Sequence, residues 1–229
     1  MSTDDKYLAL RLQGPLQSWG FDSQYNRRNT GLMPTKSAVA GMCCAAMGIP
    51  RGTDREGAFL KKFAELRMLT IAVPRTIKRW WVGDATQLEI RRLQDYHTVQ
   101  NTRKADGGLK DCHITYRQYL TDASFGVILE GESVLLGEIA DNLADPKWGL
   151  WLGRKTCIPT APVLAGLRES RDEALRLLIG DEPLESFTRQ EEAETFTEGG
   201  DSLPDQPLCF DSDRRLFAPR RIRLIHGSS

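Results

Sequence analysis

The amino-acid sequence predicts an α+β protein with one inserted arm. Stretches with the two-residue period of a strand alternate with stretches that have the period of a helix. Their order is strand, helix, strand, long polar arm, strand, helix and a further candidate strand. This is the split βαβ order of a ferredoxin-like domain, which RNA-recognition-motif (RRM-like) modules share. We therefore expect a ferredoxin-like domain that carries a long insertion and ends in an irregular C-terminal extension.

The first half of this domain is predicted from four stretches. Residues 7–12 (YLALRL) alternate leucines with other side chains, which is typical of a half-buried strand. Residues 37–48 (SAVAGMCCAAMG) follow a proline and are apolar nearly all round, so we expect a buried helix. A second helix is expected where apolar residues recur at helical spacing over 59–66, and a strand over 68–73 ends at Pro74.

The second half begins with an unusual segment. Residues 75–118 are polar, basic and without a sustained apolar period, and so long a connection is either functional or misassigned. We interpret it as a protruding arm. A strand is expected over 123–129, a helix over 132–146, and an edge strand within 157–166, whose prolines exclude a central position.

The charge of the chain is balanced in total but not in distribution. Lysine and arginine number 31, as do aspartate and glutamate. Residues 67–119 hold ten basic against five acidic residues, whereas residues 170–213 hold three against thirteen. We expect the first region to attract a polyanion and residues 180–213 to form a loose acidic loop. Five arginines near the C-terminus are left without a role: Arg214, Arg215, Arg220, Arg221 and Arg223.

Several classes of protein find no support in the sequence. The five cysteines and three histidines have no metal-ligand spacing, so we expect no metal, no cofactor and free thiols. No run of 18 apolar residues occurs, and acids precede the first apolar stretch, against the order of a secretory signal. We expect a cytoplasmic protein.

The first candidate site joins residues 10–20 (LRLQGPLQSWG) to residues 27–37 (RRNTGLMPTKS). Two glycines would let backbone approach a ligand, and a helix N-terminus attracts phosphate. Alternatively, Trp19 belongs to the core and Lys36 is a solvated helix start. The residues proposed for phosphate and base contacts are Gln13, Gln17, Trp19, Arg27, Arg28 and Lys36.

The second candidate site is the arm, where basic side chains interleave with aromatic ones. This pattern suits single-stranded nucleic acid, because cations meet phosphates and flat rings meet bases. Alternatively, Trp80 and Trp81 pack against the body. A rival interpretation is a metal-independent ribonuclease site. Its residues would be His97, His113, Tyr116 and Lys110.

The third candidate site is the glycine-punctuated turn over 148–159 (WGLWLGRKTCIP). Arg154 and Lys155 would clamp a phosphate there, or would merely flank a tight turn. The sequence contains no G-x-S-x-G motif, which leaves a hydrolase of that type unsupported.

Five stretches in this order resemble the CasD family of type I-E Cascade, part of the repeat-associated (RAMP) superfamily of CRISPR proteins. They span most of residues 7–166. They are LRLQGPLQSWG, PTKSAVAGMCCAAMGI, DYHTVQN, ITYRQYLTDASFGV and WGLWLGRKTCIPTAPVL.

The resemblance implies a ferredoxin-like palm (1–166) with a β-hairpin thumb (75–118), followed by an extension (167–229). It implies binding of the 5′ handle of the crRNA and contacts with a CasC-type backbone subunit and a CasA-type large subunit. Target DNA near the complex is a further candidate partner. The type I-E branch leaves RNA cutting to a separate subunit, CasE. Type I-C relatives cut RNA with a Tyr/Lys/His set, for which this chain shows no convincing match.

The resemblance also carries over individual residues, as RNA contacts and not as catalysts. They are Gln13, Gln17, Trp19, Arg27, Arg28, Lys36, Ser37, His97, Arg103, Lys104, Arg117, Tyr119, Arg154 and Lys155. Two alternatives stay open: a metal-independent endoribonuclease that processes repeat RNA, and an adaptor that binds only proteins.

Overall fold

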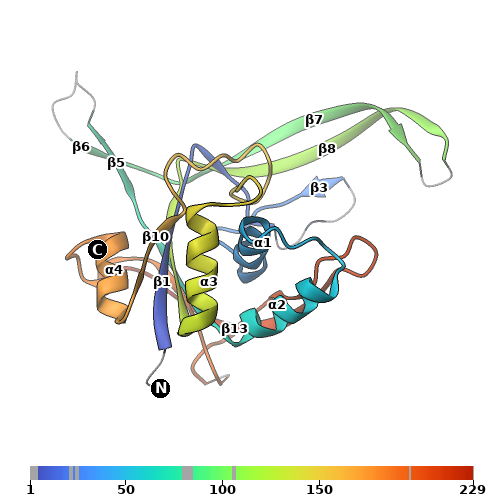
Figure 1. The fold of residues 1–229 in the computed structure, drawn as a ribbon. Coiled ribbons are helices and arrows are strands. Elements are labelled where there is room, and N and C mark those ends of the chain that lie inside the picture. The colour runs from blue at the N-terminus through green and yellow to red at the C-terminus, as the bar shows by residue number, and fades with distance from the viewer. Residues whose placement is uncertain are drawn as a thin grey trace.

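The computed structural model describes residues 5–20, 23, 26–78, 85–104, 107–195 and 197–228. Within these residues the protein is a mixed α/β structure with more strand than helix and four α-helices (Figure 1). None of the described helices is long and apolar enough to cross a membrane.

A seven-stranded sheet forms the centre of the body. Its order is β10-β1-β9-β4-β11-β13-β12, and every neighbouring pair is antiparallel. The strands predicted over 7–12, 68–73 and 123–129 are confirmed, and the candidate strand within 157–166 begins late, at Leu164. The strands are β1 (Asp5–Gln13), β4 (Arg67–Ala72), β9 (Ser124–Glu132), β10 (Leu164–Arg168), β11 (Arg189–Glu192), β12 (Asp201–Cys209) and β13 (Leu216–Ile225).

Helices cover both faces of the sheet, and strand β1 shows how. Leu8, Leu10 and Leu12 pack into the larger core with three helices, whereas Tyr7 and Ala9 face a smaller core with the fourth. This is the alternation of a strand buried on both faces. The larger core receives α1 (Lys36–Ala46), α2 (Asp54–Glu65) and α3 (Ser133–Ala144), and the smaller core receives α4 (Arg171–Ile179).

The predicted arm consists of two hairpins. The longer one, β7–β8, projects far from the body and is called the long hairpin below (Figure 1). Near the body, β8 also pairs with β2 and, in parallel, with β3. Trp80 and Trp81 lie outside the described residues. The strands are β2 (Leu16–Gln17), β3 (Arg27–Arg28), β5 (Arg75–Lys78), β6 (Ala85–Leu88), β7 (Arg91–Arg103) and β8 (Leu109–Thr121).

The C-terminal extension is regular, which contradicts the prediction of an irregular segment with a loose acidic loop over 180–213. It contains α4 and adds β11, β13 and β12 to the central sheet. The physical reason is charge pairing at long range: Arg220 bonds to Asp205 and Glu192, and Arg223 bonds to Glu191. The acidic segment and the C-terminal arginines therefore neutralise each other across paired strands.

Candidate nucleic-acid interface

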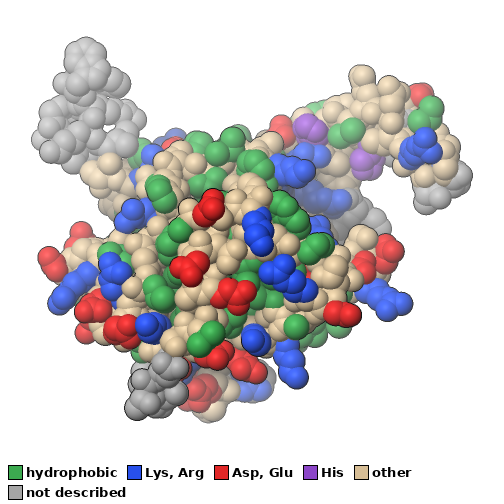
Figure 2. Space-filling model, viewed as in Figure 1, with side chains coloured by type: hydrophobic (Ala, Val, Ile, Leu, Met, Phe, Trp, Pro, Cys, Tyr) green, Lys and Arg blue, Asp and Glu red, His purple; other side chains and the backbone are tan. Residues whose placement is uncertain are grey.

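A cluster of cations and tyrosines lies where the long hairpin joins the body. Strand β3 places Arg27 beside Tyr116 and Arg28 beside Arg117 on β8. The Arg27 guanidinium stands 5.9 Å from the centre of the Tyr116 ring, and Tyr96 meets that ring edge-on at 5.5 Å. We call these five residues the hairpin-base cluster. Figure 2 shows Lys and Arg side chains gathered where the hairpin leaves the body.

Arg154 braces this cluster from the turn over 148–159. Its Nη2 donates to the Arg28 carbonyl at 2.7 Å and its Nη1 donates to the Gln118 carbonyl at 3.1 Å. Its guanidinium also lies 4.7 Å from the centre of the buried Tyr119 ring. Arg154 and Tyr119 are therefore held in contacts within the protein, whereas neighbouring Lys155 is exposed.

Two glycines allow the turn over 148–159 to pack closely against the backbone of residues 10–20. Gly153 has a φ of 97°, and a Cβ on it would collide with the carbonyl oxygen of Ser18. A Cβ on Gly14 would lie 2.7 Å from the carbonyl oxygen of Ile158. The prediction that the glycines of residues 10–20 let backbone approach a ligand is wrong for Gly14, because the turn over 148–159 fills that space.

The prediction that Gln17 and Trp19 contact RNA directly is wrong. Both side chains are fully buried. The Gln17 Nε2 donates to the carbonyls of Leu12 and Ala123, at 2.9 and 2.7 Å, and its Oε1 accepts from the Trp19 Nε1. The Trp19 ring packs edge-on against Phe125. The core alternative for Trp19 is thus confirmed.

Both predictions for Lys36, a phosphate contact and a solvated helix start, are wrong, because its side chain is buried. Its Nζ donates to the Leu66 carbonyl at 2.5 Å and lies 3.0 Å from a Glu192 carboxylate oxygen. Burial lowers the pKa of Lys36, against the opposing effect of Glu192. Its backbone N–H donates to Asp205 at 2.9 Å. The N-terminus of α1 thus holds a carboxylate of its own chain where we expected phosphate.

The remaining residues predicted in the first site are partly accessible. Gln13 and Ser37 are half-buried. The Gln13 carbonyl accepts from the backbone N–H of Thr160 at 2.9 Å, and the Ser37 hydroxyl lies 3.2 Å from that of Thr35. Arg117 donates from Nε to the Thr115 hydroxyl at 3.2 Å.

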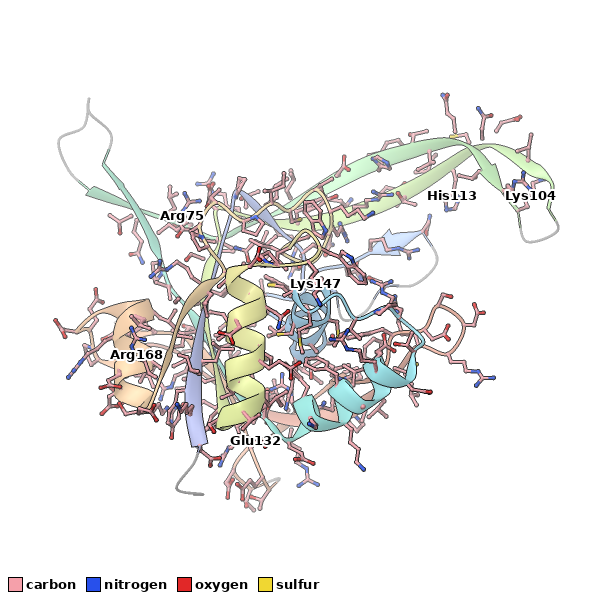
Figure 3. The ribbon with its side chains drawn as sticks, viewed as in Figure 1. Arg75, Lys104, His113, Glu132, Lys147 and Arg168 are labelled. Carbon is pink, nitrogen blue, oxygen red and sulfur yellow. The ribbon has the colours of Figure 1, made fainter. Side chains whose placement is uncertain are left out.

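The outer part of the long hairpin carries Lys104 and His113 (Figure 3). Arg103 and Lys104 are exposed near its tip, and His97 lies half-exposed 3.8 Å from Asp95. His97 is paired across the ladder with Thr115. Because neighbouring residues of a strand point to opposite faces, Tyr116 points away from the face that holds Thr115 and His97.

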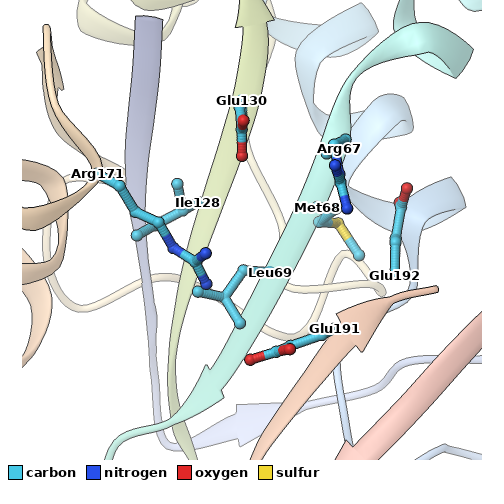
Figure 4. A pocket seen from close by; sticks show the side chains of 8 residues that line it. All are labelled: Arg67, Met68, Leu69, Ile128, Glu130, Arg171, Glu191 and Glu192. Carbon is cyan, nitrogen blue, oxygen red and sulfur yellow. The ribbon is translucent and has the colours of Figure 1, made fainter. Parts of the chain in front are cut away.

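A small pocket of about 180 Å³ lies on the α4 face of the sheet (Figure 4). Three carboxylates and two arginines line it, so its charges offset each other and an RNA phosphate finds no cationic excess. Burial raises the pKa of Glu191, but the hydrogen bonds from Arg189 and Arg223 outweigh this effect. The pKa of Glu191 is therefore lowered overall. The charged lining residues are Arg67, Glu130, Arg171, Glu191 and Glu192.

Sequence reasoning did not single out Tyr96. The signal that could have found it is the period of the strand, because Tyr96 lies opposite Tyr116 in the β7–β8 ladder. Tyr96 and Tyr116 can be paired only if the register between β7 and β8 is known. A single sequence does not fix the register of two strands of this length.

Comparisons with known proteins agree with this architecture. Residues 7–223 match the family model described as CRISPR-associated protein (Cas_Cas5). The CRISPR system Cascade subunit CasD of Escherichia coli (strain K12) is 30% identical over 226 residues, which cover 96% of each chain.

Two solved structures are similar throughout. One, described as a CRISPR RNA-guided surveillance complex, contains a chain with a TM-score of 0.74 and 29% identity, over 96% of this chain and 89% of that one. Another, described as the crystal structure of a Cas protein, has a TM-score of 0.64 and 31% identity over 97% and 98%. The match to the family model covers nearly the whole chain, and this protein therefore belongs to the Cas5 family of CRISPR-associated proteins.

Proposed function

We propose that this protein is a cytoplasmic, non-catalytic subunit of a Cascade surveillance complex that binds the 5′ handle of the crRNA. The observation that carries the proposal is the hairpin-base cluster, where the Arg27 guanidinium lies over an edge-on tyrosine pair and Arg28 and Arg117 lie on the opposite face of the hairpin. Tyr96 is 58% exposed, so its ring is accessible for stacking with a base. Membership of the Cas5 family and similarity to a Cascade subunit support the same role.

The proposal also assigns roles to the predicted residues. Side chains that are exposed or half-exposed are kept as RNA contacts, and buried or braced ones hold the surface in place. The proposed contacts are Gln13, Arg27, Arg28, Ser37, His97, Arg103, Lys104, Arg117 and Lys155. The proposed positioning residues are Gln17, Trp19, Lys36, Tyr119 and Arg154.

We further propose that residues 1–166 form a ferredoxin-like palm. The antiparallel order β10-β1-β9-β4, with α1 and α3 packed in one core, supports this. The long hairpin is the proposed thumb within 75–118. Strand β10 crosses position 166, and β11–β13 join the same sheet, so we propose that residues 167–229 fold together with the palm.

The partners proposed for the long hairpin are a CasC-type backbone subunit and a CasA-type large subunit. The hairpin projects beyond the body and exposes large apolar side chains, among them Leu93 and Leu109, at 47% and 67%. Apolar side chains that are exposed on a projecting element suit burial against a neighbouring subunit.

Geometry favours binding over cleavage. A metal-independent ribonuclease needs a base and a charge-stabilising group around one phosphate. His97 and Tyr116 belong to opposite faces of the hairpin, and the side chain of Lys110 lies outside the described residues. Tyr116 therefore does not share a phosphate with His97, whereas His113 lies two residues from Thr115 on β8 and so on the same face as His97. Variants of both histidines are needed to test this pair.

The test uses the full chain with end-labelled repeat RNA in EDTA, on native and denaturing gels side by side. We expect a retarded band with intact RNA. Replacing Arg27 and Arg117 by alanine should weaken binding and lower the salt dependence of log Kd by about 1 for each lost phosphate contact. Arg168→Ala is the matched control, because Arg168 lies on β10, away from the long hairpin (Figure 3).

The two rival functions give different results in the same experiment. Specific cleavage that disappears in His97→Ala or His113→Ala would identify a processing nuclease. Neither a shift nor cleavage would identify an adaptor that binds only proteins.

A further inference from the structure

A groove of about 670 Å³ runs along α1. Its floor is the accessible side of that helix, where Ala38, Gly41 and Ala45 leave little side-chain bulk. The turn over 148–155 forms one wall, and Phe210 with the start of β13 forms the other. The volume lies in the range of about 300–1,000 Å³ that is typical of small-molecule sites.

Two tryptophans of the turn line this groove and remain unusually accessible. Trp148 is 48% exposed and Trp151 is 38% exposed. The backbone of Trp148 is fixed on α1, because its backbone N–H donates to the Ala45 carbonyl at 3.2 Å. A Cβ on Gly149 would lie 2.7 Å from the Trp151 ring, so the indole packs directly on backbone. Rigid, accessible indoles offer flat faces for stacking at little cost in side-chain entropy.

The accessible charge of the groove is positive. Arg51, Lys155 and Arg215 line it and are exposed. The one carboxylate among the described lining residues is Glu56, which is 2% exposed. That carboxylate accepts from the backbone N–H of Gly52 at 3.3 Å and of Phe210 at 3.1 Å. A ligand would therefore meet cations at the rim and aromatic surface inside.

We propose that this groove binds one unpaired nucleotide of the RNA, with its base stacked on Trp148 or Trp151 and its phosphate near Lys155 or Arg215. The inference rests on the proposed function and adds the place where a base leaves the strand. Arg154 is bonded to the hairpin-base cluster, and Lys155 lines the groove, so one turn of chain connects the two surfaces. A single strand can thus pass from one to the other.

The experiment measures the affinity of the full chain for a labelled single-stranded repeat RNA and for a series with one abasic position each. Removal of the indole that stacks on the base, by Trp148→Ala or by Trp151→Ala, should weaken binding of intact RNA by about tenfold. One abasic position should weaken binding of the wild type by a similar factor and cause no additional loss in the tryptophan variant. This lack of additivity is what a direct base contact requires.

The controls separate stacking from folding. Trp151→Phe keeps a flat ring and should retain most of the affinity. Leu208→Ala removes a side chain on β12 that is also exposed, at 46%, but does not line the groove, and should bind as the wild type does. Thermal melting of every variant checks that the fold is kept.

The outcomes distinguish this inference from the proposed function. Tryptophan variants that bind every RNA as tightly as the wild type would overturn the groove while handle binding stands. The same would follow if they kept RNA affinity but lost a neighbouring subunit, since the groove would then be a protein dock. A wild type that binds no RNA would overturn both.

Discussion

The Asp205 carboxylate caps the backbone N–H of Lys36 at 2.9 Å, and so a residue of β12 occupies the N-terminus of α1. Asp205 also accepts two hydrogen bonds from Arg220, at 2.9 and 2.8 Å. The Lys36 side chain in turn reaches Glu192 on β11. This buried group of four charges ties the C-terminal strands to the helix whose side forms the groove.

Replacing Asp205 with alanine should strongly destabilise the protein. The change leaves the buried Arg220 guanidinium without its two-point partner and removes a helix cap. Breaking a buried ion pair typically costs about 3–5 kcal/mol of unfolding free energy. Chemical denaturation measures the loss. Asp201→Ala, on an exposed position of the same strand, is the control, and equal stability of the two variants would contradict the buried network.

Lys36 should make stability depend on alkaline pH. Burial lowers the pKa of Lys36 below its ordinary value of 10.5 in the folded state. Between the lowered pKa and 10.5 the unfolded chain binds more protons, so stability rises with pH there. The free energy of unfolding of the wild type, minus that of Lys36→Met, should therefore increase from neutral pH toward pH 10.5. A difference that stays constant would refute the lowered pKa.

The helices α1 to α3 and the strands β1, β4 and β9 could be predicted because their signals are local. The leucines of β1 alternate, and α1 begins after Thr35, whose hydroxyl accepts from the Ala38 N–H. The C-terminal strands could not be predicted in this way. Their acids are stabilised by arginines that lie 15 to 32 positions away, as in the pairs Arg220–Asp205 and Arg223–Glu191.

The residue types of the candidate site could be predicted better than the positions of their side chains. Residue type alone suggested RNA contact for Trp19 and Lys36, but burial decides what a side chain can touch, and both are inside. Conversely, the sequence does not single out Trp148 and Trp151 within the basic turn. Their accessibility depends on how that turn packs on α1, a contact between segments about 100 residues apart.

The cysteines should differ sharply in reactivity toward a thiol reagent. Cys112 lies exposed on the long hairpin, whereas Cys43 and Cys44 are buried in α1. Burial raises the pKa of Cys44 to about 12, and the thiolate is the reactive form. In the native protein at pH 7.5 to 8 we expect fast modification of Cys112 and none of the α1 pair until denaturant is added. Cys112→Ser should abolish the fast phase.

Gly153 should be intolerant of a side chain, because its backbone lies against the first loop in a left-handed conformation. Its φ is 97°, and a Cβ would collide with the Ser18 carbonyl oxygen. Gly153→Ala should therefore lower the free energy of unfolding by more than about 1 kcal/mol. It should also weaken RNA binding, since the turn that carries Arg154 must move away from β8.

Gly137→Ala is the matched control for that substitution. Gly137 lies inside α3, and a Cβ there would meet nothing within 4 Å. Alanine in a helix interior is more favourable than glycine by about 0.5–1 kcal/mol, so this variant should be slightly more stable and bind RNA normally. Thermal or chemical denaturation and the gel shift measure both effects. If Gly153→Ala behaved like Gly137→Ala, the turn would not be held against Ser18, and neither the brace at Arg154 nor the wall of the groove could depend on that contact.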